Sequence, residues 1–455
     1  MNANKIKALI KMIINECHYI SFALLVIMRE IKSIKIHHLQ LPLFCCMVVG
    51  YYYFGYVQHI GPMSLGVVCL IMLSSLSYLN YCVRSSGKFP VPHVAISILM
   101  LLLVLWLYTV NKDELIRLLR IIVIPLILIF SIKEAIRSVR QVNLALIIMA
   151  FIVSISCIVA VLQAMDIDFF WNLRMMIGVP YSSELQLQLA NRVRTPGLAF
   201  YSVPLSYQIS AIFPFIIYLI YISKSKKKII MLGLCVVLGA LASKALSSIM
   251  SILVCYIVFS KLNNLLNLKR LYSVIAVGIV LILCMTPFNN IASRFTKIDS
   301  TAFSRIPCTI IGTKMLLASP SGVKGEEYLE LKRHHLRSIQ YLPGASYAKS
   351  AAFHNCMLNV GVRCGWVVFI GYVLLYVYIF RFIYRAMKNC TIGSADYYFY
   401  SSAIAYFCAY IIQSFTHNAG LTTGDPYDWI TIGVILAYKP SQINSDECSK
   451  NDEKI

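Results

Sequence analysis

Acidic residues are scarce in this sequence, and charged residues of any kind are few. Its 455 residues include 19 Asp and Glu against 41 Lys and Arg, and only 13% are charged, whereas 59% are hydrophobic. Soluble globular proteins carry roughly 25% charged residues, so this composition excludes a soluble protein. The net charge of +22 follows from short basic loops between apolar runs, and we expect no nucleic-acid partner.

The sequence also lacks the usual signatures of metal sites and of secretion. None of its 15 cysteines belongs to a CxxC pair or to a His/Cys cluster with metal-ligand spacing. We therefore expect no metal and no cofactor. Cys308 and Cys356 could form a disulfide if both lie outside the cytoplasm. Residues 1–16 are basic and interrupted, so we expect no cleavable signal peptide.

Apolar runs recur along nearly the whole chain, and each is long enough to cross a hydrocarbon core of about 30 Å as a helix. We predict an all-α polytopic membrane protein with about twelve transmembrane helices. The apolar stretch at 20–28 is too short to span and fits an amphipathic helix on the cytoplasmic face. The predicted spans are 41–57, 62–82, 91–110, 117–132, 143–165, 203–222, 228–242, 246–260, 271–288, 358–384, 396–414 and 427–438.

Lys and Arg concentrate in alternate loops, which orients the chain. With about twelve spans, all the basic loops fall on one side, so both termini are predicted to be cytoplasmic and the protein to lie in a bacterial inner membrane. The long loops then face outward, into the periplasm in a Gram-negative bacterium. The predicted divisions are an interfacial segment 1–40, transmembrane helices 41–288 with a first periplasmic loop 166–202, a large periplasmic loop 289–357, transmembrane helices 358–438 and a tail 439–455.

The first outer loop carries Arg192 and Arg194 just before a Pro-Gly turn at Gly197. Guanidinium groups can hold phosphate through paired donors, and a Pro-Gly turn lets the backbone come close to a ligand. A helix entrance with solvated arginines is the alternative. Lys244 interrupts an apolar stretch too long for one span, so we expect the chain to reverse there; its ammonium either snorkels to the outer surface or has an anionic partner.

The second outer loop carries Arg305 and ends on His354-Asn355, directly before an apolar run. A helix is predicted from Arg305 to Leu317, with a break at 319–323. The basic run 332–335 is interpreted as a solvated face, because adjacent histidines do not share a side of a helix. A histidine beside a membrane is often structural, but its place at the end of an arginine-rich outer loop makes His354 a catalytic candidate.

Arginines without metal ligands suit a donor that brings a diphosphate leaving group, because neutralising its charge lets it depart without a carboxylic acid. A neutral imidazole could then deprotonate an acceptor hydroxyl. A glycosidase would need two opposed carboxylates, and none are paired in this sequence. Asp166 and Asp168 offer an alternative, a divalent-cation site of a metal-dependent glycosyltransferase.

The chain resembles the O-antigen polymerase and O-antigen ligase family of bacterial surface-polysaccharide enzymes over roughly residues 185–385. The resemblance rests on a set of short motifs in order: Arg194-Thr195-Pro196-Gly197 with Pro204, the polar break at Lys244, Arg305, Pro320-Ser321-Gly322-Val323, and His354-Asn355 with Leu358, Gly361 and Gly365.

This resemblance implies a metal-independent, inverting glycosyl transfer from an undecaprenyl-diphosphate-linked oligosaccharide. His354 would activate the acceptor, Arg194 and Arg305 would hold the diphosphate, and Arg192 and Lys244 would add electrostatic contacts. Asn355 and Gly197 would support the site, and membrane lipid and a chain-length regulator protein would be partners. The Arg-x-x-Gly element favours polymerase over ligase. A flippase is the alternative from another class, but the sequence lacks the repeated halves typical of transporters.

Overall fold

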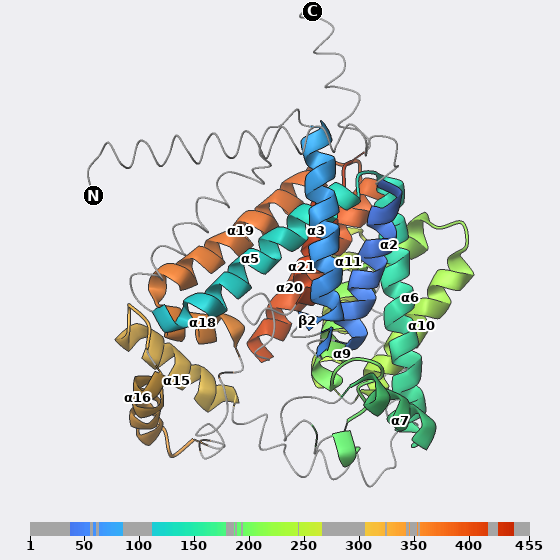
Figure 1. The fold of residues 1–455 in the computed structure, drawn as a ribbon. Helices are drawn as coiled ribbons and strands as arrows, with labels where there is room; N and C mark the ends of the chain where they lie inside the picture. The colour runs from blue at the N-terminus through green and yellow to red at the C-terminus, as the bar shows by residue number, and fades with distance from the viewer. Residues whose placement is uncertain are drawn as a thin grey trace, which may run out of the picture.

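The computed structural model describes fourteen α-helices, nearly all of them running up and down one bundle (Figure 1). It describes residues 37–54, 58–60, 63–84, 112–178, 186, 189–192, 194–243, 245–265, 305–323, 325–342, 345, 353, 355–416 and 426–440. A two-stranded hairpin, β1 (Gln58–Ile60) and β2 (Met63–Ser64), contains the only strands within those ranges. The predicted surface helix at 20–28, the spans at 91–110 and 271–288 and the tail from 441 lie outside them.

Ten of the predicted spans fall on described helices, with boundaries shifted by a few residues. The helices are α2 (His37–Val49) with the π-turn η1 (Gly50–Phe54), α3 (Leu65–Arg84), α5 (Lys112–Ala135), α6 (Val139–Ala164), α9 (Ser202–Ile222), α10 (Lys226–Ala242), α11 (Leu246–Leu262), α20 (Ala395–Thr416), α21 (Pro426–Ala437), and, for the span predicted at 358–384, two helices. These two are α18 (Cys356–Cys364) and α19 (Trp366–Lys388). The prediction of one continuous span there was wrong, because Gly365 interrupts it.

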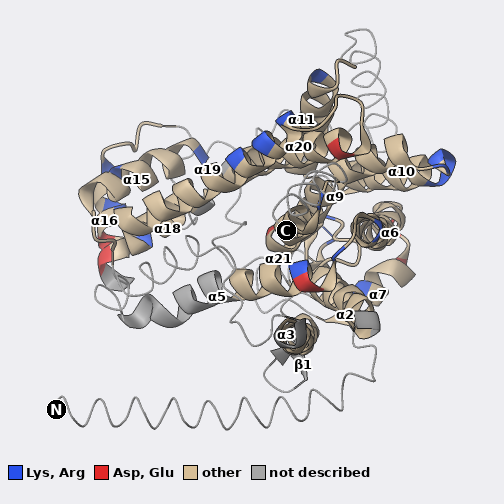
Figure 2. Cartoon of the chain, turned by 90° about the horizontal axis from the view of Figure 1, so that it is seen from above, with Lys and Arg blue, Asp and Glu red and all other residues tan. Residues whose placement is uncertain are grey.

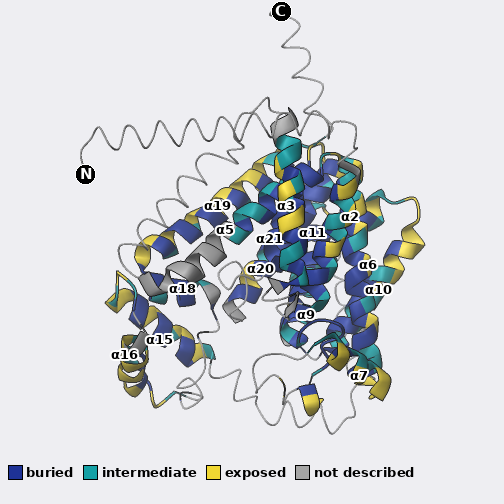
Figure 3. Cartoon of the chain, in the orientation of Figure 1, coloured by how far each residue is buried: buried dark blue, intermediate teal, exposed yellow. Residues whose placement is uncertain are grey.

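Three of the described helices are long and apolar enough to cross a membrane: α6, α9 and α19. On α6 the exposed apolar side chains Leu144, Ile147, Phe151 and Ile158 recur every three, four or seven residues, which places them on one side of the helix. On α19 exposed and buried residues also alternate with helical spacing (Figure 3). Such stripes are unfavourable in water and favourable against lipid, so the chain is a membrane protein.

The order of the helices places the basic loops and the long loops at opposite ends of the bundle. Helix α6 leads into the first long loop, α9 leads away from it, and α10 returns, packed against both. The loop between α9 and α10, next to the basic tip of α10 in Figure 2, therefore lies at the other end. The same reasoning puts the end of α19, with Arg381, Arg385 and Lys388, at that end. The described basic loops thus share one end of the bundle, and which side of the membrane that end faces stays a prediction.

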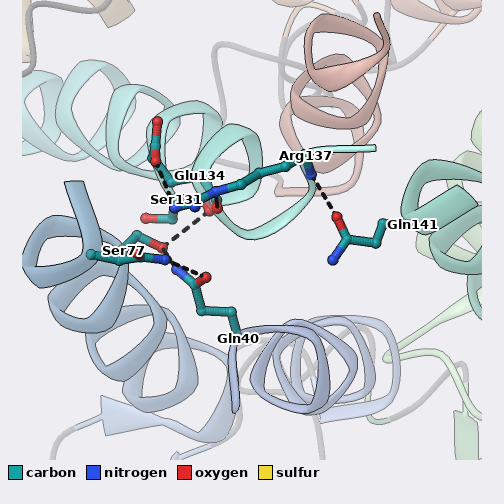
Figure 4. A network of polar contacts seen from close by, with 7 residues as sticks. Gln40, Ser77, Ser131, Glu134, Arg137 and Gln141 are labelled. Carbon is teal, nitrogen blue, oxygen red and sulfur yellow. Dashed lines mark hydrogen bonds and ion pairs between the residues drawn. The ribbon is translucent and has the colours of Figure 1, made fainter. Parts of the chain in front are cut away.

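Helices α2, α3 and α5 are joined near the basic end by buried polar side chains (Figure 4). The Gln40 amide donates to Ser77 Oγ over 3.2 Å, and the Ser77 hydroxyl donates to the Ser131 carbonyl over 3.2 Å. One turn further along, Arg137 pairs with Glu134 over 3.1 Å, and the Arg137 backbone N–H donates to the Gln141 side chain. These bonds satisfy polar groups that could not reach water there, and so they fix how the three helices are aligned.

Candidate functional site

The first half of the candidate site is a tight turn at residues 194–200, held against α6. Gly197 has φ +61°, and a Cβ at this position would lie 2.2 Å from the Ser156 carbonyl oxygen. The Gln163 side chain accepts from the Gly197 N–H over 2.9 Å and donates to the Gly197 carbonyl over 3.1 Å. The Ser156 hydroxyl accepts from the Leu198 N–H over 3.0 Å. The Pro-Gly turn was predicted to let the backbone come close to a ligand; the backbone at Gly197 instead comes close to α6.

The same turn is joined to the polar break between α10 and α11. The Thr195 hydroxyl, fully buried, donates to the Ala242 carbonyl over 2.8 Å. The chain reverses at Ser243–Ala245, as predicted from the excessive length of the apolar stretch. Lys244 itself lies outside the described residues, but its neighbours Ser243 and Ala245 are buried beside the turn. Two motifs separated by about fifty residues thus meet at one place.

A third element, α7 (Asp168–Ile177), holds the turn from the other side through Arg174, which the sequence analysis did not consider. Arg174 is fully buried. Its guanidinium donates to the Ala199, Phe200 and Gly178 carbonyls over 2.6, 3.0 and 2.8 Å. Burial lowers its pKa to about 10, so it stays charged at neutral pH. A single Arg inside the aromatic run that begins at Phe169 was the available signal.

The two arginines before the turn have different surroundings. Arg194 is half-buried. Arg192 donates to Asp166 over 2.6 Å and to Asp168 over 2.5 Å, and its guanidinium lies 5.7 Å from the centre of the Trp171 ring. A phosphate would have to compete with two carboxylates for Arg192, and a divalent cation would have to displace the guanidinium from both acids. The geometry therefore disfavours Arg192 as an anion ligand.

The second half of the candidate site consists of α15 (Arg305–Ala318), α16 (Gly325–Arg337) and α18. Arg305, half-buried, begins α15, as predicted. The Asn355 side chain accepts from the Leu358 N–H over 3.1 Å and so caps α18. His354 lies outside the described residues, but Phe353 and Asn355 on either side of it are buried. The backbone that leads to and from His354 is therefore anchored at both ends.

The break between α18 and α19 explains the Pro-Ser-Gly-Val motif. Gly322 and Gly365 have φ +88° and +86°, and each lies against the other's segment. A Cβ on Gly322 would be 2.5 Å from the Arg363 carbonyl, and a Cβ on Gly365 would be 2.5 Å from the Pro320 carbonyl. The Trp366 N–H donates to that Pro320 carbonyl over 2.9 Å. The motif is thus a clasp that joins the outer loop to the start of α19.

The basic run 332–335 was interpreted as a solvated face, and this was wrong for Lys332. Arg333 and His334 are exposed, but Lys332 is only 4% exposed, and its ammonium lies 5.6 Å from the centre of the Phe353 ring. Burial lowers the pKa of Lys332. Helical spacing places Lys332 on the same side of α16 as Tyr328 and Leu336, and that side packs inward. Lys332 thus adds a buried positive charge next to the residue that precedes His354.

Phe353 is the centre of this second half. Its ring packs edge-on against Tyr328 at 5.8 Å and lies close to Gly312 of α15. The Arg363 guanidinium lies 5.1 Å from the centre of the Tyr328 ring. The two rings therefore contact each other, and each also contacts one cation, an arrangement stabilised by cation–π contacts. Cys308, near Lys332, is a buried free thiol, so the possible disulfide with Cys356 is not formed.

Figures 1 and 2 place α7 and α15 at the same end of the bundle but on opposite sides of it. The structure therefore brings Thr195 to the polar break and Gly197 to α6, and it packs α15, which begins at Arg305, against the helix that Asn355 caps, while the two halves stay apart. Among the described residues, no group of three His, Cys, Asp or Glu could hold a metal ion. Comparison with protein-family models and with curated proteins gives no match.

Proposed function

We propose that this protein is an O-antigen polymerase of a bacterial inner membrane. It would join undecaprenyl-diphosphate-linked repeat units at the outer face by inverting, metal-independent glycosyl transfer. The observation that carries the proposal is the built turn at 194–200. Side chains of α6 and α7 and a carbonyl of α10 hold residues 195–200 of this turn, so the backbone that follows Arg194 is held beside the polar break. A cation carried by such a preorganised backbone is what the departure of a diphosphate requires.

In the proposed reaction His354 takes the proton from the acceptor hydroxyl. The acceptor oxygen forms a bond to the anomeric carbon of the donor from the face opposite the diphosphate, and the bond to the diphosphate oxygen breaks. Undecaprenyl diphosphate leaves with the bonding electrons, and Arg194 and Arg305 neutralise its charge. Arg192 is already paired with Asp166 and Asp168, so in this reaction it would add only a supporting electrostatic contact.

The test uses a strain that lacks the native gene and scores the length of surface glycan on a gel. His354→Ala and Arg305→Ala should each leave a single repeat unit in place of a ladder. His334→Ala and Arg333→Ala are matched controls, because both side chains are exposed on α16, and their ladders should be normal. Normal ladders for both site variants at normal protein levels would exclude the assigned site.

Two further measurements separate the alternatives. If Arg194 and Arg305 hold one diphosphate, the double variant should lose less activity than the product of the two single losses, because each single change already weakens the same interaction. Deletion of the gene should leave one repeat unit on the lipid A core. A core with no repeat, and glycan accumulating on the carrier lipid, would instead identify a ligase that uses the same residues.

A further inference from the structure

Helix α7 presents three different sides, and each is occupied by a different kind of residue. Trp171 and Arg174 point inward, where the Trp171 indole donates to the Gln163 carbonyl over 3.1 Å. Asp168 is exposed on a second side, where it pairs with Arg192, and Asn172 lies at the border of that side, three residues after Phe169 and four before Met176. Phe169 and Met176, seven residues apart, share a third side, and they are 65% and 83% exposed. The inner contacts fix the rotation of α7, so the third side faces out permanently.

The exposed apolar side of α7 continues the exposed stripe of α6. The stripe at Leu144, Ile147, Phe151 and Ile158 extends by seven residues to Met165, which is 65% exposed at the end of α6. Phe169 follows four residues later, after the chain bends at Asp166. In Figure 3 exposed residues mark both α7 and the outer side of α6. Because α6 is a candidate membrane span, its exposed stripe faces lipid, and the surface that continues it lies at the level where the bilayer ends.

We propose that Phe169 and Met176 of α7 bind the phospholipid surface on the side of the two long outer loops, with α7 lying in the headgroup region. An interfacial helix has its apolar side buried about 5–10 Å into the boundary between headgroups and acyl chains, and its polar side in water. Phe169 and Met176 meet the first requirement, and Asp168, about a quarter of a turn away from them, meets the second. Leu173, half-buried, lies between the lipid side and the inner side.

This placement has a consequence for the turn at 194–200. Arg174 joins α7 to the Ala199 and Phe200 carbonyls, so the depth of α7 in the interface also sets the depth of the turn. Arg194 would then stand at the level of lipid phosphates. The inference concerns α7 alone and does not depend on glycosyl transfer, so the lipid contact can be tested without an activity assay.

The experiment places the photo-crosslinking residue p-benzoylphenylalanine at single positions of the full chain in nanodiscs of phosphatidylethanolamine and phosphatidylglycerol with alkyne-tagged acyl chains. Positions 169 and 176 test the proposed lipid side. Position 168, on the polar side of the same helix, is the matched negative control, and position 151 on α6 is the positive control. Elution of each variant as a single chromatographic peak shows that it is folded before irradiation.

The expected result is a lipid adduct at positions 151, 169 and 176 and several-fold less at 168. Adduct at 151 without adduct at 169 and 176 would overturn the proposal, since that side of α7 would then face water. Crosslinks from 169 or 176 to another protein chain would overturn it in favour of a protein interface. Equal adduct at 168 and 169 would show that α7 is immersed without orientation, which also contradicts it.

Discussion

Replacing Gly365 with alanine tests whether the clasp between the outer loop and α19 depends on close backbone contact. Gly365 has φ +86° and ψ 179°, a conformation found almost only in glycine. Its Cβ would also lie 2.5 Å from the Pro320 carbonyl oxygen. Gly393 provides a matched control, because its φ is +83° and a Cβ there would meet nothing within 4 Å.

The two substitutions separate backbone strain from overlap. Gly393→Ala should lower the free energy of unfolding only because a side chain at positive φ strains the backbone, by about 1–2 kcal/mol. Gly365→Ala should suffer the same backbone strain and must also displace two backbone segments, and overpacking of this kind adds about 1–3 kcal/mol. The loss of stability at Gly365 should therefore be at least about twice that at Gly393.

The measurement is the apparent Tm in detergent, followed by the monodisperse peak in size-exclusion chromatography after heating. In domains of 150–250 residues each kcal/mol lowers Tm by about 2–4 °C, and the effect falls with size, so Gly393→Ala should lower Tm by a few degrees and Gly365→Ala by clearly more. Glycan ladders should shorten for Gly365→Ala alone if the clasp positions the second half of the site. Equal Tm losses in the two variants would refute the overlap argument.

Three further predictions use the same Tm assay. Thr195→Val should destabilise by about 1–3 kcal/mol because it leaves the buried Ala242 carbonyl without its donor, whereas Thr195→Ser, which keeps the hydroxyl, should cost less. Arg174→Met should destabilise more than Thr195→Val, since three carbonyls lose their donor at once; a smaller effect would contradict the bonding described. Because burial lowers the folded-state pKa of Lys332, the folded protein releases that proton before the unfolded chain does, and stability should rise as pH increases from the lowered pKa toward 10.5. Lys332→Met should remove that rise, and an identical pH dependence in both proteins would contradict it.

The helices and the reversal of the chain could be predicted because they depend on local pattern. Apolar runs set the lengths of α6, α9 and α20, and the polar residues around Lys244 fix the point of reversal, since about thirty apolar residues exceed one membrane crossing. The start of α15 at Arg305 and the break at 319–323 followed from the same kind of signal. The count of about twelve spans stays a prediction, with three described helices meeting the length and composition of a span.

The misses arose where contacts distant in sequence decide the outcome. An apolar run gives no sign that Gly365 adopts positive φ, because that conformation depends on the Pro320 segment lying against it. Lys332 is polar by type, but the apolar side of α16 and the ring of Phe353 bury it. Arg192 was interpreted as a phosphate contact, yet Asp166 and Asp168, more than twenty residues earlier, bind it first.

Both halves of the candidate site are built in the same way, and this bears on how they could act together. In each, the residue proposed for chemistry adjoins backbone fixed by buried neighbours: Arg194 beside the turn at 195–200, and His354 between Phe353 and the Asn355 cap. The described backbone beside both residues is thus held in place, which lowers the reorganisation needed when charge develops on a substrate. Since the halves lie on opposite sides of one end of the bundle (Figure 2), one diphosphate cannot contact Arg194 and Arg305 at once in this arrangement, and the proposed reaction requires the two halves to come together when the donor binds. If they do not come together, the activity losses of the two single variants should multiply in the double variant.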